Sequence, residues 1–193
     1  MESLNKSEAR KYFLNLRHAL TNEQVEKLDQ DLLKHFQQLD LSGISRVHLF
    51  LPILSKKEVN TYPMAQWLRE QHPEIQLVLS RSNFDDHSLS HFIWDQRTQL
   101  VENRWGITEP QGGREISAEE IDLILVPMLA CDKKGHRVGY GKGFYDRFLA
   151  QCRNNVQKVG LSFFKPIDQI SDLNEHDIPL DACITPQKIW WFA

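Results

Sequence analysis

The chain has 193 residues, of which 41% are hydrophobic and 25% charged, so it can bury a sizeable core. We expect one α/β domain over residues 1–193, with a helical pair in residues 1–40 packed against it. The net charge of −3 argues against a nucleic-acid binder with a generally basic surface. No segment approaches the roughly 20 apolar residues of a membrane span, and the N-terminus lacks the apolar stretch of a signal peptide. We therefore expect a cytoplasmic protein, and a monomer.

The first predicted element is an amphipathic helix over residues 3–20. At about 100° per residue, Lys6, Arg10 and Arg17 fall within roughly 40° of one another along one edge of its apolar face. A charged stripe on a helix is usually its solvated side. Here Lys11 already lies on the outward face, so the sequence favours a basic stripe that overhangs a cleft.

The remaining elements alternate between strands and helices. In chain order they are a helix opened by a capping box at Thr21–Gln24, a strand at 47–51, a helix capped by Thr61 that ends before Pro73, a strand at 75–79, a surface loop at 81–88, a strand at 89–94, an irregular loop at 105–113, a buried strand at 121–126, a helix from Phe144, a strand at 156–162, a loop at 172–181, and short strands at 183–185 and 189–192. This alternation predicts an α/β fold with a mostly parallel, doubly wound sheet. Helices on both faces make three layers, and ligands bind at the carboxyl ends of the strands.

The stretch that follows the buried strand at 121–126 carries the strongest functional signal. Pro127 ends the strand, and a basic loop closes with three glycines in five residues, 139–143, before the helix from Phe144. Glycines let the backbone approach a ligand closely, and a helix N-terminus adds partial positive charge. Because Arg137 and Lys142 add full charges, we expect the bound anion to be phosphate.

This loop differs from two better-known phosphate loops. A Walker A loop needs Ser or Thr where Gly143 follows Lys142, and a dinucleotide fingerprint needs glycine where the chain has Phe144. The alternative is a flexible basic loop that uses its glycines only to turn. Asp146, in the first turn of the helix, would repel a phosphate unless a cation lay between them, which suggests Mg²⁺. Asp146 could instead simply complement the helix dipole.

Two further residues have ambiguous roles. Cys131 lies beside the glycine loop, but no neighbouring base is identifiable, so we interpret it as a core residue rather than a nucleophile. The other cysteines, Cys152 and Cys183, are widely separated from it and from each other, so neither a disulfide framework nor a thiolate zinc site is indicated. Trp105 is suited to stacking on a planar ligand, although a buried anchor is the commoner role for a single Trp.

Taken together, these motifs resemble those of a known family. The string Asp132-x-x-Gly135-x-Arg137-Val138-Gly139-x-Gly141-x-Gly143-Phe144-Tyr145-Asp146-Arg147-x-Leu149 is similar to the signature of 5-formyltetrahydrofolate cyclo-ligases. The resemblance covers most of the chain. It also includes Lys6-x-x-x-Arg10, Glu58-Val59-x-Thr61, Gly106-Ile107-x-Glu109-Pro110 and the late His176-Asp177 pair.

The resemblance implies ATP and a reduced folate as small-molecule substrates, with Mg²⁺ as cofactor. ATP would be bound by Lys6, Arg10, Arg137, Val138, Gly139, Tyr140, Gly141, Lys142, Gly143, Phe144 and Tyr145. The folate would contact Leu51 and Glu58, helped by Tyr140, Gly141, Lys142, Gly143 and Phe144, and we add Trp105 to this set. Asp146 and Asp177 would hold Mg²⁺, and Arg137, Lys142 and Glu58 would take part in catalysis.

In the implied reaction, ATP phosphorylates the formyl oxygen of 5-formyltetrahydrofolate, N10 closes onto the activated carbon, and phosphate leaves. Such chemistry depends on positioning and on charge stabilisation. Glu58 would hold the N–H donors of the pterin or move a proton during ring closure. Two rival hypotheses are a sugar-phosphate isomerase or CoA-transferase-like enzyme, and a module that binds nucleotide or folate without turnover. The Lys6 and Arg10 pair favours ATP, since a sugar phosphate needs only one phosphate site.

Overall fold

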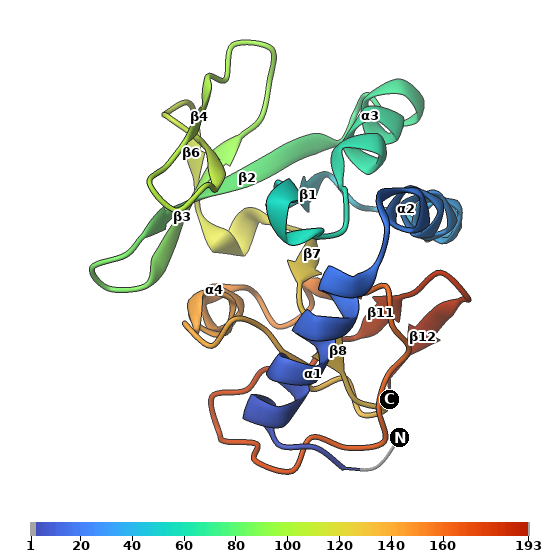
Figure 1. Cartoon of the computed structure of the whole chain (residues 1–193). Coiled ribbons are helices and arrows are strands. Elements are labelled where there is room, and N and C mark those ends of the chain that lie inside the picture. The colour runs from blue at the N-terminus through green and yellow to red at the C-terminus, as the bar shows by residue number, and fades with distance from the viewer. Residues whose placement is uncertain (1–2, 193) are drawn as a thin grey trace.

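The structure is a computed structural model that describes residues 3–192 (Figure 1). Its helices are α1 (Lys6–Ala19), α2 (Asn22–Phe36), α3 (Tyr62–Gln71) and α4 (Phe144–Gln151), with 3-10 turns η1 (Leu54–Lys56) and η2 (Ala118–Glu120). Its strands are β1 (Arg46–His48), β2 (Gln76–Asn83), β3 (Ser88–Ile93), β4 (Leu100–Glu102), β5 (Thr108–Pro110), β6 (Glu115–Ile116), β7 (Leu123–Pro127), β8 (Ala130–Cys131), β9 (Arg137–Val138), β10 (Gln157–Leu161), β11 (Ala182–Ile184) and β12 (Ile189–Trp191). No helix in this range is both long and apolar enough to cross a membrane.

The main sheet confirms the predicted fold class. Among the described residues it has eight strands in the order β12-β11-β10-β7-β1-β2-β3-β6. Neighbours from β11 to β2 pair in parallel, whereas β12, β3 and β6 pair antiparallel at the two edges. The chain passes from β1 to β2 through α3 and from β7 to β10 through α4. The strand order therefore reverses between β1 and β7, which is where ligands bind in open α/β sheets.

Two apolar clusters of the described residues hold helices to the faces of this sheet. On one face, Leu32 of α2 and Met64 of α3 pack with core residues of β1, β2, β7 and β10. On the other face, Phe148 of α4 packs with Ile124 and Val126 of β7. Figure 1 shows α2 and α3 on one side of the sheet and α4 on the other, so the predicted three layers are present. Cys131 is buried in the cluster beneath α4, and Cys183 and burial raise its pKa well above the usual value, so it is a core residue.

Helix α1 lies apart from these layers, on the hairpin that follows β7. Its Ala9 and Phe13 pack with Ala130 of β8 and Val138 of β9. The capping box of α2 is present as predicted, and Asn5 forms a second one that starts α1. Because the hairpin extends from the carboxyl end of β7, α1 is placed beside the expected ligand edge of the sheet.

Several sequence-based expectations about local structure were wrong. The segment 81–88 is not a surface loop, because β2 and β3 extend into it as a hairpin with Asn83 paired to Ser88. Most of its residues are polar, yet the backbone ladder of β2 and β3 pairs them as strands. The segment 105–113 likewise contains a strand, β5, that pairs with β4. Thr61 precedes α3 but does not cap it, because its hydroxyl donates to the Phe50 carbonyl.

Candidate active site

A large cleft opens where the strand order reverses. Its volume is about 850 Å³, within the usual range for small-molecule sites. The residues that follow β1, Leu49 to Leu51, line one part of it, and Pro127 at the end of β7 lines another. Helix α1 contributes Lys6 and Arg10 to the lining. Strand β1 is shorter than the predicted 47–51 strand, which leaves Leu51 free to turn into this cleft.

The glycine loop runs along the cleft and leads into α4. Gly141 and Gly143 have φ values of +87° and +73°, which L side chains rarely adopt. A Cβ on Gly141 would lie 3.0 Å from Arg10 Nη2, and Arg10 Nε donates to the Gly139 carbonyl at 3.0 Å. Gly139 differs, because its φ is not positive and a Cβ there would meet nothing within 4 Å. Its lack of a side chain leaves open space against the backbone.

Basic side chains gather on this side of the cleft, and we call Arg10, Arg137, Lys142 and Arg147 the basic wall. Among the described residues, Arg10, Lys142 and Arg147 form no ion pair; Arg147 Nη1 instead donates to the Lys142 carbonyl at 3.3 Å. Lys6 lies nearby but pairs with Asp177 at 2.5 Å. The basic wall thus presents unneutralised positive charge, as an anionic ligand requires.

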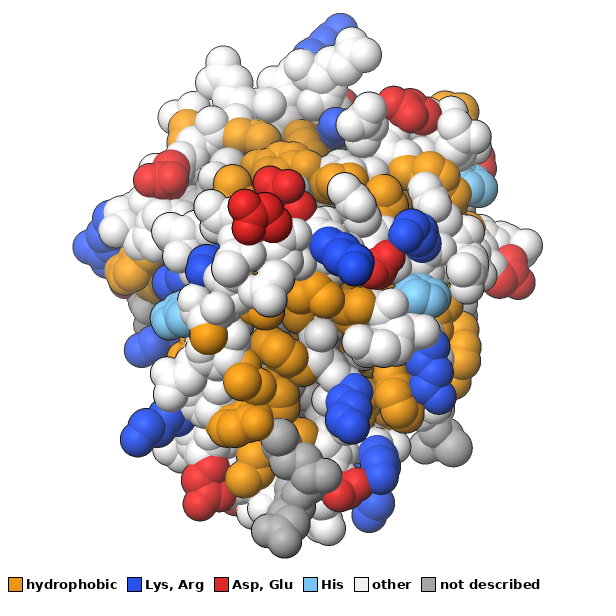
Figure 2. All heavy atoms as spheres, turned by 45° about the vertical axis from the view of Figure 1, so that its right-hand side comes forward, with side chains coloured by type: hydrophobic (Ala, Val, Ile, Leu, Met, Phe, Trp, Pro, Cys, Tyr) orange, Lys and Arg blue, Asp and Glu red, His pale blue; other side chains and the backbone are white. Residues whose placement is uncertain are grey.

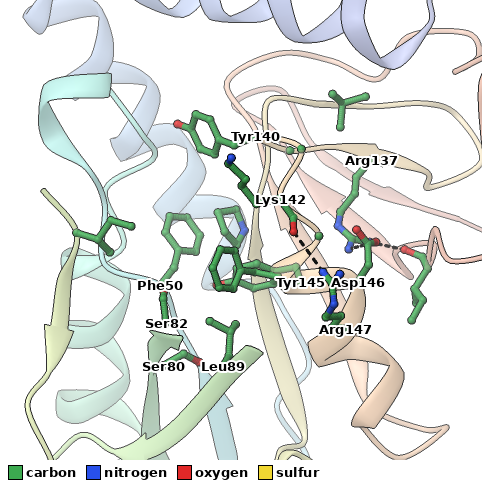
Figure 3. Close-up of a pocket in the computed structure, with 18 of the residues that line it drawn as sticks. Phe50, Ser80, Ser82, Leu89, Arg137, Tyr140, Lys142, Tyr145, Asp146 and Arg147 are labelled. Carbon is green, nitrogen blue, oxygen red and sulfur yellow. Dashed lines mark hydrogen bonds and ion pairs between the residues drawn. The ribbon is translucent and has the colours of Figure 1, made fainter. Parts of the chain in front are cut away.

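Arg137 is the buried member of this wall. Its Nη2 donates to Asp146 Oδ1 at 2.6 Å, and its Nη1 donates to the Ile178 carbonyl (Figure 3). Burial lowers the pKa of Arg137, and the carboxylates of Asp146 and Asp177 oppose that shift. Asp146 and Asp177 therefore both lie close enough to one guanidinium to influence it, although they are 31 positions apart in sequence.

These two carboxylates fit a magnesium site that is completed by a ligand. Each uses one oxygen in an ion pair, Asp146 Oδ1 with Arg137 and Asp177 Oδ2 with Lys6, and both residues line the cleft. No group of three or more His, Cys, Asp or Glu residues within 3–192 forms a ready-made metal cage. Mg²⁺ commonly binds through one or two carboxylates together with phosphates and water, so the donor set matches that mode.

The opposite side of the cleft is mostly apolar, and we call Phe50, Leu51, Leu79 and Leu89 the apolar wall. Figure 3 shows Phe50 and Leu89 on one side of Tyr145, with Arg137, Asp146 and Arg147 on the other. An apolar surface facing a basic one suits a ligand pair in which a flat heterocycle meets a polyphosphate.

The floor beside the apolar wall is polar but uncharged. His48 Nε2 and His91 Nδ1 each lie 2.8 Å from the Ser80 hydroxyl, which joins β1, β2 and β3. Burial, with a smaller contribution from His91, lowers the pKa of His48 well below its usual value. Burial likewise lowers the pKa of His91 to about 4. Both rings are therefore neutral at physiological pH and leave the floor without charge.

Glu58 is the acidic group next to the apolar wall. It is buried, with 6% of its surface exposed, and it lines the cleft. Its Oε2 accepts from the Ile53 backbone N–H at 2.8 Å, and its Oε1 accepts from the Tyr140 hydroxyl at 2.5 Å. The glycine loop thus reaches across the cleft through Tyr140 to hold this carboxylate.

Trp105 does not line the cleft, in contrast to the other predicted site residues. Its ring is 44% exposed and stacks on Phe84 with centroids 3.6 Å apart. Phe84 in turn makes an edge contact with Phe144, which does line the cleft. Trp105 therefore belongs to an aromatic cluster outside the cleft, and its exposure shows that the buried-anchor interpretation was wrong.

All the remaining predicted residues lie around this one cleft: Lys6, Arg10, Leu51, Glu58, Arg137, Val138, Gly139, Tyr140, Gly141, Lys142, Gly143, Phe144, Tyr145, Asp146 and Asp177. Sequence reasoning missed Phe50, which follows β1, Leu79 and Ser80 of β2, and Leu89 of β3. They carry no local motif, and only their place at the ends of neighbouring strands could have indicated them.

Comparison with known proteins gives a consistent result. The sequence profile of the 5-formyltetrahydrofolate cyclo-ligase family matches residues 2–186. The chain is 29% identical to the 5-formyltetrahydrofolate cyclo-ligase of Escherichia coli (strain K12), over 90% of this chain and 96% of that protein. It is also 29% identical to the Haemophilus influenzae enzyme of the same name, over 91% and 92% of the two chains.

Solved structures agree with these sequence matches. The NMR structure of 5,10-methenyltetrahydrofolate synthetase from Aquifex aeolicus superposes with a TM-score of 0.80 at 29% identity, covering 96% of this chain and 92% of that one. The synthetase from Mycoplasma pneumoniae superposes with a TM-score of 0.74 at 25% identity, covering 94% and 98%. The chain therefore belongs to the 5-formyltetrahydrofolate cyclo-ligase family.

Proposed function

We propose that this chain carries out the reaction of its family in the cleft between the basic wall and the apolar wall. ATP phosphorylates the formyl oxygen of 5-formyltetrahydrofolate and leaves as ADP; N10 then bonds to the activated carbon and loses its proton. Phosphate departs to give the 5,10-methenyl product. The observation that carries the proposal is that one cleft is lined both by basic groups that form no ion pair among the described residues, Arg10, Lys142 and Arg147, and by the side chains of the apolar wall.

The triphosphate would lie along the glycine loop. The open space beside Gly139 supports this placement, because a ligand can approach the backbone there without meeting a protein atom. Arg10, Lys142 and Arg147 supply positive charge along the loop, and a triphosphate needs several such groups. Val138, Phe144 and Tyr145 also line this part of the cleft. Lys6 would exchange its pairing with Asp177 for a phosphate.

Mg²⁺ would be held by Asp146 and Asp177, with the phosphates completing its ligands. The support is that both carboxylates line the cleft and influence the buried Arg137, and that each retains one oxygen outside its ion pair. The cation neutralises phosphate charge that two carboxylates would otherwise repel. Arg137 would orient Asp146 from its buried position, and Lys142 would stabilise the charge of the transferred phosphoryl group.

The reduced folate would place its pterin on the apolar wall. Phe50, Leu51 and Leu89 offer the contact area, and Glu58 offers a buried acceptor for the amino and ring N–H donors of a pterin. The fixed orientation of Glu58, held by Ile53 and Tyr140, favours this binding role over proton transfer. The aromatic cluster of Phe84, Trp105 and Phe144 would meet the part of the folate that leaves the cleft.

We further propose that the chain acts as a monomer in the cytoplasm and does not bind nucleic acid. In support of a monomer, one chain supplies both walls of the cleft. Cys131, Cys152 and Cys183 are free thiols, as expected of a reducing compartment. Figure 2 shows basic, acidic and apolar side chains together on one face, and the net charge of −3 supports the proposal that nucleic acid is not a partner.

The decisive experiment mixes the protein with Mg-ATP and 5-formyltetrahydrofolate and follows the absorbance of the methenyl product. We expect stoichiometric formation of product and ADP, with ADP appearing only when the folate is present. Omitting ATP, or replacing the folate with a sugar phosphate, should give no turnover. Binding of both substrates without product would instead support a module that does not turn over.

A further inference from the structure

Arg17 of α1 is a buried guanidinium that no part of the proposed function uses. Only 5% of its surface is exposed, and within residues 3–192 it makes no ion pair with a carboxylate. Its Nη2 donates to the Tyr140 hydroxyl, while its Nε is buried without a partner in the described part of the chain. A buried charge with an unsatisfied donor destabilises a fold, so stability alone does not account for Arg17.

The hydrogen bond from Arg17 fixes the direction in which Tyr140 donates. A phenol has one proton, and a guanidinium can only donate, so the Tyr140 oxygen must accept from Arg17. Its proton is then directed to Glu58 Oε1, 2.5 Å away. Since Ile53 N–H holds the other oxygen of Glu58 at 2.8 Å, the orientation of the carboxylate is determined at both oxygens.

Charge reinforces this geometry. Arg17 and Glu58 carry opposite charges on either side of Tyr140, and the Arg17 Cζ lies 5.7 Å from the centre of the Tyr140 ring. Burial and the nearby Glu58 raise the pKa of Tyr140, so the hydroxyl keeps its proton at neutral pH. Tyr140 therefore remains a donor to Glu58.

We propose that Arg17 is a positioning residue for the folate, acting through Tyr140 to hold Glu58 in the orientation that accepts the N–H donors of the pterin. The inference rests on the proposed role of Glu58. On this proposal, the basic stripe of α1, formed by Lys6, Arg10 and Arg17, is divided between the two substrates. Lys6 and Arg10 lie at the nucleotide, whereas Arg17, two to three turns further along the helix, serves the folate.

The test measures the Kd of 5-formyltetrahydrofolate by calorimetry, and the KM values for folate and ATP, in Arg17→Met, Tyr140→Phe and the double variant. We expect each single change to weaken folate binding about 10-fold, because a hydrogen bond to a charged group is lost. The KM for ATP should change less than twofold in Arg17→Met. The double variant should be no weaker than either single one, since both changes break the same chain of hydrogen bonds.

If Arg17 had a merely structural role, Arg17→Met would lower the Tm. We expect that the Tm does not fall, because replacing a buried charge with an apolar side chain of similar length often leaves stability unchanged or raises it. Arg17→Lys, which keeps the charge and a donor, should recover part of the folate affinity. Lys11→Met, an exposed change on the same helix, should have no effect.

Three outcomes would overturn the inference: unchanged folate Kd in Arg17→Met, equal changes in both KM values, or additive effects of Arg17→Met and Tyr140→Phe. If Arg17→Met fails to fold, Tyr140→Phe alone still decides, because it must weaken folate binding selectively. Because calorimetry measures folate binding without turnover, this test does not depend on the proposed reaction. Normal folate binding without methenyl product would contradict the reaction, while an unaltered Kd in the variants would contradict only the role of Arg17.

Discussion

The basic wall and the apolar wall of the cleft are built in different ways. Three of the four residues of the basic wall come from one continuous segment, 137–147, and α1 adds Arg10. The apolar wall is assembled from Phe50, Leu79 and Leu89, which follow or belong to three different strands. A phosphate site can be encoded locally, because glycines, a helix N-terminus and basic side chains fit within a few residues. A surface for a flat ring depends on strands brought together by the whole sheet.

The largest expected effect concerns the cation site behind the basic wall. Asp146→Asn should lower turnover on the order of 10³-fold, because the variant supplies a weaker oxygen ligand and leaves the buried Arg137 without its carboxylate. Asp177→Asn should act in the same direction but more mildly. Extra Mg²⁺ should restore activity only in part.

Nucleotide affinity with and without Mg²⁺ separates this metal role from a dipole role. Wild-type protein should bind ATP more tightly with Mg²⁺, and Asp146→Asn should lose most of that difference. If the variant binds Mg-ATP as tightly as wild type and turns it over normally, Asp146 only complements the helix dipole and the metal assignment is wrong.

Lys142→Ala should cost about 10²-fold in turnover without disturbing the fold, since one donor to the transferred phosphoryl group is removed. The side chain is exposed and forms no ion pair among residues 3–192, so nothing in the core depends on it. Lys134→Ala, an exposed change earlier in the same loop, is the matched control. Unchanged kinetics at both limiting and saturating ATP would show that Lys142 does not contribute.

On the apolar wall, Phe50→Ala should raise the KM for 5-formyltetrahydrofolate about 10-fold, because part of the contact area of the pterin is lost. Phe84→Ala, an aromatic change outside the cleft, should have a much smaller effect. Steady-state kinetics with ATP held at saturation provide the measurement. A change in the KM for ATP of the same size would argue against separate walls.

On α1, Arg10→Ala should raise the KM for ATP roughly fivefold, and Lys6→Ala should act similarly but more weakly, because Lys6 must first leave Asp177. Lys11→Ala, which faces solvent, should leave the KM unchanged. Equal behaviour of all three variants would mean that the helix is merely a charged surface element.

The smallest effect is expected outside the cleft. Trp105→Ala should raise the KM for folate about threefold or less, because the ring meets only the part of the folate that leaves the cleft. Comparing folates with short and long glutamate tails would check this, since the effect should depend on the tail. A loss as large as that of Phe50→Ala would place Trp105 against the pterin instead.

Local sequence patterns predicted much of the fold and most of the residues of the basic wall. The apolar run at 121–126 predicted a buried central strand, and β7 is that strand. The spacing of Lys6, Arg10 and Arg17 predicted a stripe that faces the cleft. Lys6 and Arg10 line the cleft, and Arg17 contacts Tyr140 of the glycine loop. These signals are local, because each depends on periodicity within one element.

The features that were missed depend on distant parts of the chain. The Lys6 and Asp177 pair joins residues 171 positions apart, and the Tyr140 bridge to Glu58 joins residues 82 positions apart, so no spacing rule reveals them. Polarity misled the prediction at 81–88, where a solvent-exposed hairpin needs no apolar residues to form its ladder. Tertiary contacts, rather than local propensity, decided those cases.

The central claim is that nucleotide and folate occupy opposite walls of one cleft, and a crossed kinetic measurement tests it most directly. The KM values for ATP and for 5-formyltetrahydrofolate would be determined in wild type, Arg10→Ala, Phe50→Ala and the double variant. We expect that Arg10→Ala raises only the KM for ATP, that Phe50→Ala raises only the KM for folate, and that the double variant shows both changes independently. If either single change raises both KM values equally, the two walls do not divide the substrates as proposed.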